Sequence, residues 1–272
     1  PAFPGVRDAA DFGEAWQACP DWCLANFAHA AYQPRPALLA TCRRVGARDV
    51  RVFSRRGARA FVLRHGDAGI LVFRGTQASR PRPAPEALRR QAAALVGRLP
   101  GRWPTLPARY RQFLLNDLLA DLDVARVRLG GAEVHRGFLG ELRKLWRDLG
   151  PALRAPATGG ALRWYFAGHS LGGALATLAA LRVPAESVVT FGEPRPGRHL
   201  ARSFRGPAAI HRRYVNGRDP VPQLPPAGWP FDYAHHGEAI AVGDPASAEP
   251  LIDHSVMDYV DRVAAARGGV IG

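Results

Sequence analysis

Residues 164–180 read WYFAGHSLGGALATLAA, and this stretch decides the fold that we predict for the chain. An apolar run, residues 164–167, ends at a glycine; after His169 and Ser170, two more glycines open a segment rich in alanine and leucine. A short apolar run bounded by glycine is typical of a buried strand, and an alanine- and leucine-rich segment favours a helix. The stretch therefore predicts a strand, a sharp turn and a helix.

The turn itself reads G-x-S-x-G, with Gly168 and Gly172 on either side of Ser170. At a sharp strand-to-helix turn the serine is held in a strained conformation with its Oγ exposed above the sheet, and the glycines relieve the crowding around it. A helix beginning at Leu171 directs free N–H groups at a group bonded to that oxygen. We predict that Ser170 is a nucleophile. A phosphate-binding loop would need a GK[ST] ending or a G-x-G-x-x-G pattern, and the chain has neither.

The composition is that of an ordinary globular protein with an excess of arginine. The chain has 272 residues, 47% of them hydrophobic, and a formal net charge of +14. The basic residues are spread from Arg7 to Arg267 instead of forming one block, which disfavours nucleic-acid binding but is compatible with attraction to anionic surfaces. No apolar run approaches the ~18 residues that a membrane-spanning helix needs.

The cysteines and the N-terminus bear on disulfides, metal binding and cellular location. Three cysteines, Cys19, Cys23 and Cys42, form neither an even disulfide set nor a paired zinc motif, so we expect no metal site. The first residues lack a basic region followed by an apolar one, so no secretory signal is visible. Both a cytoplasmic location and a secreted protein with its signal removed remain open, as does the oligomeric state.

The order of the elements predicts a mostly parallel central sheet with helices on both faces and antiparallel hairpin strands at the N-terminal edge. After a helix over residues 11–32, the first strand-like runs are separated by short turns: residues 50–53, 60–63 and 70–73. Further strands are expected at residues 124–129, 134–138, 163–167, 187–191, 210–215 and 239–242. Helices are expected at residues 139–149, 171–182, 198–204 and 253–266.

We expect a single domain over residues 1–272 with a lid or insertion at residues 77–115. This segment begins and ends rich in proline. Residues 85–99 within it predict an amphipathic helix with leucines on one side and arginines on the other.

A serine nucleophile needs a base that is oriented by an acid, and in this fold the chain order is serine, acid, histidine. We choose His254, because it follows the last predicted strand and opens the last predicted helix. Asp219 is the carboxylate in the proline-rich loop NGRDPVPQLPP, directly after the strand at 210–215. Glu193, after an earlier strand, and Asp253, adjacent to the histidine, are its rivals.

Acyl transfer also needs N–H donors where negative charge develops on the carbonyl oxygen. One is the backbone N–H of Leu171, the residue after the serine. The other is expected from Thr76, which follows the strand at 70–73, with Gly75 allowing close backbone approach.

Several segments together resemble the class 3 lipases, the fungal-type triacylglycerol lipases with the α/β-hydrolase fold. These segments are FRGT at 73–76, VHRGF at 134–138, GHSLGGALATL at 168–178, TFGEPRPG at 190–197 and NGRDPVPQLPP at 216–226. The resemblance implies a catalytic triad of Ser170, Asp219 and His254. It also implies an oxyanion hole of Thr76 and Leu171, and an aspartate at Asp121 that orients the oxyanion residue.

The function implied is a serine-dependent lipase or carboxylesterase that hydrolyses acylglycerols or related esters through an acyl-enzyme intermediate, without a cofactor. A phospholipase A1 or a feruloyl or aryl esterase would use the same triad, and an inactive scaffold would lack one of its members. The stretch between Thr76 and Asn116 is longer and more basic than the short lid helix of the family. We therefore expect residues 85–99 to act as a cationic lid that opens on anionic lipid surfaces.

Overall fold

The structure is a computed structural model that describes residues 2–76, 125–155, 161–204, 210–228, 232–266 and 268. The predicted lid at 77–115, its helix at 85–99, and Asp121 lie outside the described residues. The prediction of one domain over the whole chain therefore stays a prediction.

Within these residues, one sheet has seven strands in the order β1-β2-β3-β6-β7-β9-β10. The strands are β1 (Arg48–Arg55), β2 (Ala58–His65), β3 (Ala68–Phe73), β6 (Arg163–His169), β7 (Ser187–Phe191), β9 (Ile210–Asn216) and β10 (Glu238–Val242). β1, β2 and β3 are antiparallel neighbours, whereas β3, β6, β7, β9 and β10 run parallel. The predicted α/β-hydrolase arrangement, with antiparallel strands at the N-terminal edge, is confirmed.

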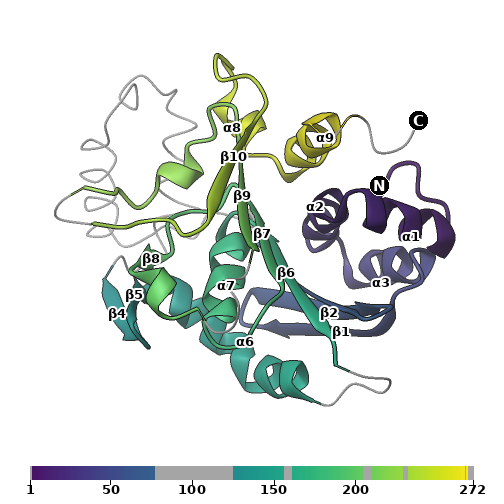
Figure 1. Cartoon of the computed structure of the whole chain (residues 1–272), viewed down its shortest axis with the longest axis horizontal. Coiled ribbons are helices and arrows are strands. Elements are labelled where there is room, and N and C mark those ends of the chain that lie inside the picture. The colour runs from purple at the N-terminus through teal and green to yellow at the C-terminus, as the bar shows by residue number, and fades with distance from the viewer. Residues whose placement is uncertain are drawn as a thin grey trace.

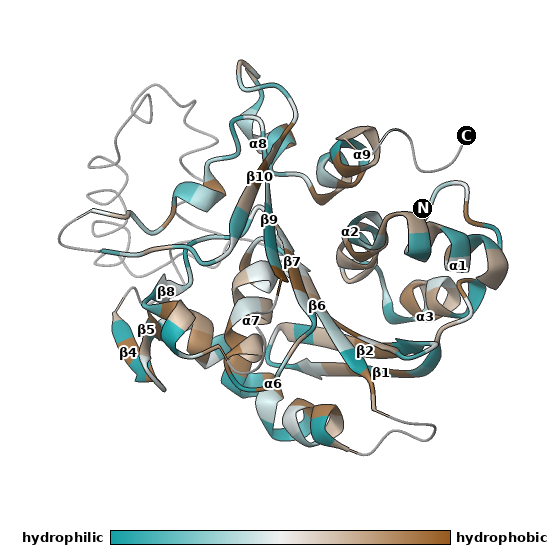
Figure 2. Cartoon of the chain, in the orientation of Figure 1, coloured by the Kyte–Doolittle hydropathy of each residue, from teal (hydrophilic) through white to brown (hydrophobic). Residues whose placement is uncertain are grey.

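Helices cover both faces of this sheet (Figure 1). One face carries α1 (Ala9–Ala18), α2 (Pro20–Ala30), α3 (Arg35–Arg44) and α9 (Val256–Ala266), and the other carries α6 (Arg136–Arg154) and α7 (Leu171–Ala180). In Figure 2 brown, hydrophobic residues lie on the middle strands of the sheet and on the helices that cover them. The parallel strands are thus buried on both faces, as covered parallel sheets require.

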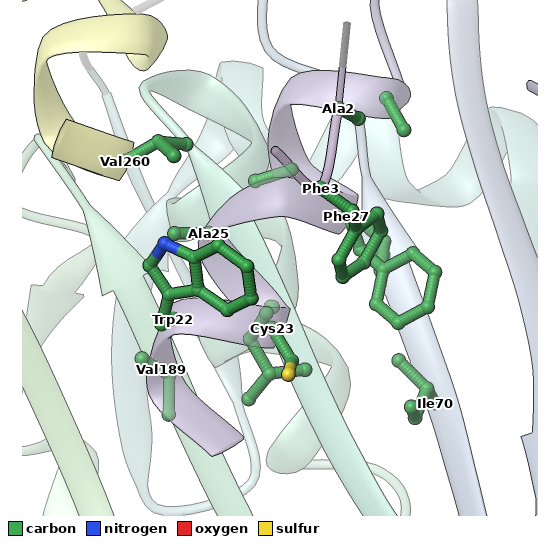
Figure 3. Packing of buried hydrophobic residues seen from close by; sticks show 14 of the residues in the cluster. Ala2, Phe3, Trp22, Cys23, Ala25, Phe27, Ile70, Val189 and Val260 are labelled. Carbon is green, nitrogen blue, oxygen red and sulfur yellow. The ribbon is translucent and has the colours of Figure 1, made fainter. Parts of the chain in front are cut away.

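Two hydrophobic clusters, one on each face, fix the helices to the sheet. Figure 3 shows part of the first, in which Phe3 and Phe27 meet edge to face with ring centroids 4.8 Å apart. In the second, α6 buries a stripe of residues at helical spacing: Phe138, Leu142, Leu145, Leu149 and Leu153. This periodicity explains why so polar a segment forms a long helix against the sheet.

Four expected elements differ from the structure. In place of the helix expected at 198–204, β8 (Gly197–Arg198) is followed by a 3-10 turn, Leu200–Arg202. The single helix at 11–32 is two helices that break at Cys19, because Pro20 has no N–H to donate to the preceding turn. The strand expected at 134–138 ends at His135, and α6 begins at the next residue. The final helix expected from 253 is a short α8 (Pro250–Asp253) followed by α9.

A second, smaller antiparallel sheet contains β4 (Arg126–Leu129), β5 (Ala132–His135) and β8 (Gly197–Arg198). Gly197 is needed there because a Cβ on it would lie 2.3 Å from the carbonyl oxygen of Glu133. None of the described helices is both long enough and apolar enough to cross a membrane.

Candidate active site

The strand-to-helix turn predicted from the sequence is present. β6 ends at His169, α7 begins at Leu171, and Ser170 between them has φ 58° and ψ −133°. This left-handed conformation is sparsely populated by residues other than glycine and costs about 1–3 kcal/mol, so the surrounding packing must hold it. The turn is fixed by a hydrogen bond from Ser170 N–H to the Phe191 carbonyl, 2.9 Å.

The two flanking glycines are sterically required. A Cβ on Gly168 would lie 2.2 Å from the carbonyl oxygen of Gly172, and a Cβ on Gly172 would lie 2.3 Å from the carbonyl oxygen of Phe73. Both distances are far below any real contact, so only glycine lets the helix begin this close to the strands. The predicted reason for the two glycines, crowding at the turn, is confirmed.

The three side chains predicted to cooperate are hydrogen-bonded in one row. His254 Nε2 lies 3.1 Å from Ser170 Oγ, and His254 Nδ1 lies 2.8 Å from Asp219 Oδ2. All three residues are buried. Because a carboxylate can only accept, Nδ1 carries the proton, and the bare Nε2 is free to accept the serine proton. The arrangement can raise the nucleophilicity of the serine hydroxyl.

His254 reaches this position from a loop instead of from a helix start. It directly follows α8, and two residues later α9 begins. Our expectation that His254 opens the last helix is therefore wrong. From the connection between the two helices the imidazole reaches Ser170, directly after β6.

Asp219 lies in the loop after β9 and accepts three hydrogen bonds. Besides His254, the N–H of Val221 donates to Oδ1 at 2.9 Å and the hydroxyl of Tyr259 donates to Oδ2 at 2.6 Å. Burial, then the charge of Asp219, raises the pKa of Tyr259 well above its usual value, so the phenol stays protonated and donates. The carboxylate is thus held with its charge toward the imidazole.

Sequence reasoning missed Tyr259. It is fully buried in α9, and its hydroxyl also accepts the N–H of Asn216 at 3.1 Å. The only local signal was a tyrosine at an apolar position of a helix, which predicts burial and a hydrogen-bond partner but does not say which partner.

The two rival carboxylates have other partners. Glu193 accepts hydrogen bonds from Thr177 and Thr190 and lies beside His211. Asp253 accepts from the N–H of Arg218 and from the hydroxyl of Ser247. The choice of Asp219 over both rivals agrees with these contacts.

The residues expected to form the oxyanion hole come from two strand ends. Leu171 is the first residue of α7, where the backbone N–H has no partner inside the helix. Thr76 is exposed and follows Gly75, and a Cβ on Gly75 would lie 3.1 Å from the Cβ of Ser170. The end of β3 therefore passes directly beside the serine.

Among the described residues, no group of three or more histidine, cysteine, aspartate or glutamate side chains could hold a metal ion. Cys19, Cys23 and Cys42 are buried thiols and not disulfides, and burial raises the pKa of Cys23 and Cys42, which keeps them protonated.

Comparisons with known proteins agree on one family. The family profile described as "Lipase (class 3)" matches residues 108–229. The secreted mono- and diacylglycerol lipase 1 of Fusarium solani is 32% identical to this chain over 152 residues, covering 53% of this chain and 45% of that protein. Phospholipase A1-II 6 of Oryza sativa subsp. japonica is 35% identical over 130 residues, covering 39% of this chain and 31% of that protein. The chain thus matches less than half the length of either relative.

Among solved structures, the crystal structure of a lipase from Rhizopus microsporus var. chinensis has the same fold. The TM-score is 0.51 at 20% identity, covering 86% of this chain and 72% of that one.

Proposed function

The chain belongs to the class 3 lipase family, and from this premise we propose that it is a serine ester hydrolase that cleaves acylglycerols or related esters through an acyl-enzyme. The observation that carries the proposal is the row from Asp219 through His254 to Ser170, with hydrogen bonds of 2.8 and 3.1 Å. The strained turn that presents the serine supports it independently.

In the proposed reaction, His254 takes the proton of Ser170 as Oγ attacks the ester carbonyl carbon. The negative charge that forms on the carbonyl oxygen is stabilised by the N–H of Leu171 and by Thr76. His254, as imidazolium, then protonates the departing alcohol, and the acyl group remains on Ser170. Water, deprotonated by the same imidazole, hydrolyses this ester and releases the acid. Asp219 stabilises the imidazolium in both steps.

The test is hydrolysis of p-nitrophenyl esters from short to long acyl chains, alongside a triglyceride emulsion. We expect turnover by the full chain, and loss of about 10⁴-fold or more in kcat for Ser170→Ala, with unchanged folding by circular dichroism. Turnover that persists in the Ser170→Ala variant would contradict the proposal. A steep rise in rate once the ester aggregates would identify a lipase, and activity limited to short dissolved esters would identify an esterase.

A finer part of the proposal is transient binding to anionic lipid surfaces through the tip of the β1–β2 hairpin. Arg55 and Arg56 are exposed there, and the tip lies at the carboxyl end of β3, because Arg74 N–H bonds the Arg59 carbonyl at 3.0 Å. Arg56 has φ 47°, a left-handed turn position that asparagine or glycine fills at lower cost. An arginine at a strained position beside the active-site edge supports a role for its charge.

Vesicle binding tests this part. We expect Arg56→Asn to weaken binding to vesicles that contain phosphatidylserine, and to leave folding intact or improved because asparagine suits the turn. Arg48→Asn, an exposed arginine at the other end of β1, is the matched control. Equal loss in both variants would show that only net charge matters, and would contradict a docking role for the tip. Hydrolysis of phosphatidylcholine in the same assay tests the phospholipase A1 alternative, which the rice relative supports.

A further inference from the structure

Behind the serine runs a row of hydrogen bonds that the proposed reaction does not use; it is buried at His169 and half-buried at Tyr32. The hydroxyl of Tyr32, two residues after the end of α2, lies 2.9 Å from Nδ1 of His169, and Nε2 of His169 lies 2.7 Å from the backbone carbonyl oxygen of His254. His169 is the residue immediately before Ser170 and is 6% exposed. A buried imidazole with both nitrogens engaged is a rigid connection between distant segments.

The direction of these hydrogen bonds follows from chemistry. A carbonyl oxygen only accepts, so Nε2 of His169 carries a proton; the neutral ring then has a bare Nδ1, which accepts the Tyr32 hydroxyl proton. Burial, and then the neighbouring His254, lower the pKa of His169 well below its usual value, so the ring stays neutral. The row therefore has a single arrangement of donors and acceptors at physiological pH.

The other end of the row meets the strand that carries Thr76. The Tyr32 hydroxyl packs against Gly75, which follows β3. The fit is close, because a Cβ on Gly75 would lie 2.2 Å from the Tyr32 hydroxyl and 2.5 Å from the His169 carbonyl oxygen. The row thus joins the end of β3 to the loop that holds His254.

The loop at His254 is held at two places. Asp253, the last residue of α8, accepts hydrogen bonds from Asn216, Arg218 and Ser247. The bond from His169 to the His254 carbonyl adds a second attachment, to β6. The imidazole rings of His169 and His254 also lie against each other, with centroids 4.7 Å apart. A shift of the loop would move Nε2 of His254 away from the serine oxygen.

From this geometry we infer that Tyr32 and His169 are positioning residues. They fix the backbone of His254 relative to the end of β3, and so keep the distance between the imidazole base and the oxyanion donors constant. The expected effect on turnover rests on the proposed function, whereas the fixed position of His254 rests on the row of hydrogen bonds alone. Because both side chains act through the backbone around Ser170 and His254, we expect their removal to affect the chemical step more than substrate affinity.

The kinetic test is Tyr32→Phe, which removes one hydroxyl and no carbon. We expect kcat for a dissolved p-nitrophenyl ester to fall about 10-fold, because small displacements of catalytic groups are costly, while KM stays within twofold. Tyr214→Phe is the matched control: Tyr214 is 1% exposed and donates to Asp21 at 2.7 Å, in the same core but away from the row. We expect the control to lower Tm by a similar amount and to keep the wild-type kcat.

A double-mutant cycle tests whether the two residues act as one unit. His169→Gln keeps an amide N–H for the His254 carbonyl but loses the ring between its two partners. We expect the kcat of the Tyr32→Phe, His169→Gln double variant to equal that of His169→Gln alone within about twofold, because the two changes break the same connection. Losses that multiply, or a Tyr32→Phe variant that resembles the Tyr214→Phe control in kcat, would overturn the inference.

Nitrogen-15 NMR of the imidazoles provides a readout that does not need turnover. We expect the Nε2–H tautomer for His169 in the wild-type chain from pH 5 to 8, and changed His254 resonances in Tyr32→Phe but not in Tyr214→Phe. Unchanged His254 resonances in both variants would overturn the inference even if the chain had no esterase activity. An inactive wild-type chain with the expected spectra would instead contradict the proposed function alone.

Discussion

The protein contains two buried carboxylate–imidazole pairs that differ in their surroundings. Asp219 and His254 lie 2.8 Å apart over the turn at Ser170, and Glu193 and His211 lie 3.4 Å apart beside α7. All four residues are buried. By residue type, burial and spacing alone, either pair could belong to a catalytic triad.

The difference lies in what surrounds each carboxylate and what the imidazole faces. Glu193 accepts hydrogen bonds from Thr177 at 2.6 Å and Thr190 at 2.8 Å, so this pair ties α7 to two strands. The imidazole of His254 faces a serine in a strained turn instead. A buried carboxylate–histidine pair therefore becomes chemically useful only when the second ring nitrogen meets a hydroxyl that a substrate can reach.

The largest expected difference between the two carboxylate–imidazole pairs is in turnover. Asp219→Asn should lower kcat by about 10³–10⁴-fold, because an amide there favours the wrong tautomer of His254. Glu193→Gln should change kcat less than about threefold, since that carboxylate acts only on packing. Single-turnover kinetics on a dissolved ester checks both variants, and similar losses in the two would break the distinction between the pairs.

For stability, the larger effect should come from the Glu193–His211 pair and not from the Asp219–His254 pair. Burial alone would raise the pKa of Glu193, but the hydrogen bond and charge of His211, with Thr177, lower it to about 2. The folded pKa thus lies below the unfolded value of about 4.3, so the stabilisation is present above that pH and is lost as pH falls toward 2. Glu193→Gln should lower the free energy of unfolding at pH 7 by about 3 kcal/mol.

Urea unfolding between pH 7 and pH 3 measures that prediction. The wild-type chain should lose stability steeply below about pH 4.5, and Glu193→Gln should lose less over the same range. Parallel curves for the two proteins would mean that Glu193 is not the group responsible for acid sensitivity.

Relief of strain at the serine is the next effect in size. Ser170→Gly should abolish turnover and raise the free energy of unfolding by about 1 kcal/mol, because glycine adopts φ 58° without a steric cost. Ser54→Gly, at an exposed position of β1, is the control and should lower stability by about 0.5–1 kcal/mol. A Ser170→Gly variant that is destabilised like the control would argue against strain at the turn.

The effects of the single hydroxyls on the two carboxylates should be similarly small. Tyr259→Phe removes the donor at 2.6 Å from Asp219 and should lower kcat about fivefold. Thr177→Val removes the matching donor to Glu193 and should lower stability by about 1–2 kcal/mol with kcat unchanged. If Thr177→Val lowered kcat as much as Tyr259→Phe, the two pairs would be coupled and not separate.

Elements with strong local signals were predictable from the sequence. The strand at 187–191 has the expected bounds, and the turn at Ser170, the hairpins and the parallel order are as predicted. These features depend on glycine, proline and apolar runs, which act over a few residues. The helix break at Pro20 also had such a signal, and the apolar periodicity of residues 11–32 concealed it.

The supporting contacts of the site were not predictable. Tyr32 and His169 are 137 positions apart, and Tyr259 and Asp219 are 40 apart, so no local pattern links them. Asp219 and His254 could be chosen because the chain order of this fold limits the candidates. The catalytic roles of these residues stay predictions, as do those of Thr76, Leu171 and Asp121.

The most direct test of the central claim is covalent labelling with a p-nitrophenyl alkylphosphonate, followed by peptide mass spectrometry. The reagent phosphonylates a serine activated by an adjacent imidazole and releases p-nitrophenol. The account predicts one adduct per chain on Ser170, no adduct in Ser170→Ala, and labelling at least about 10²-fold slower in Asp219→Asn. Labelling of another residue, or of Ser170 at the same rate when Asp219 is replaced, would contradict it.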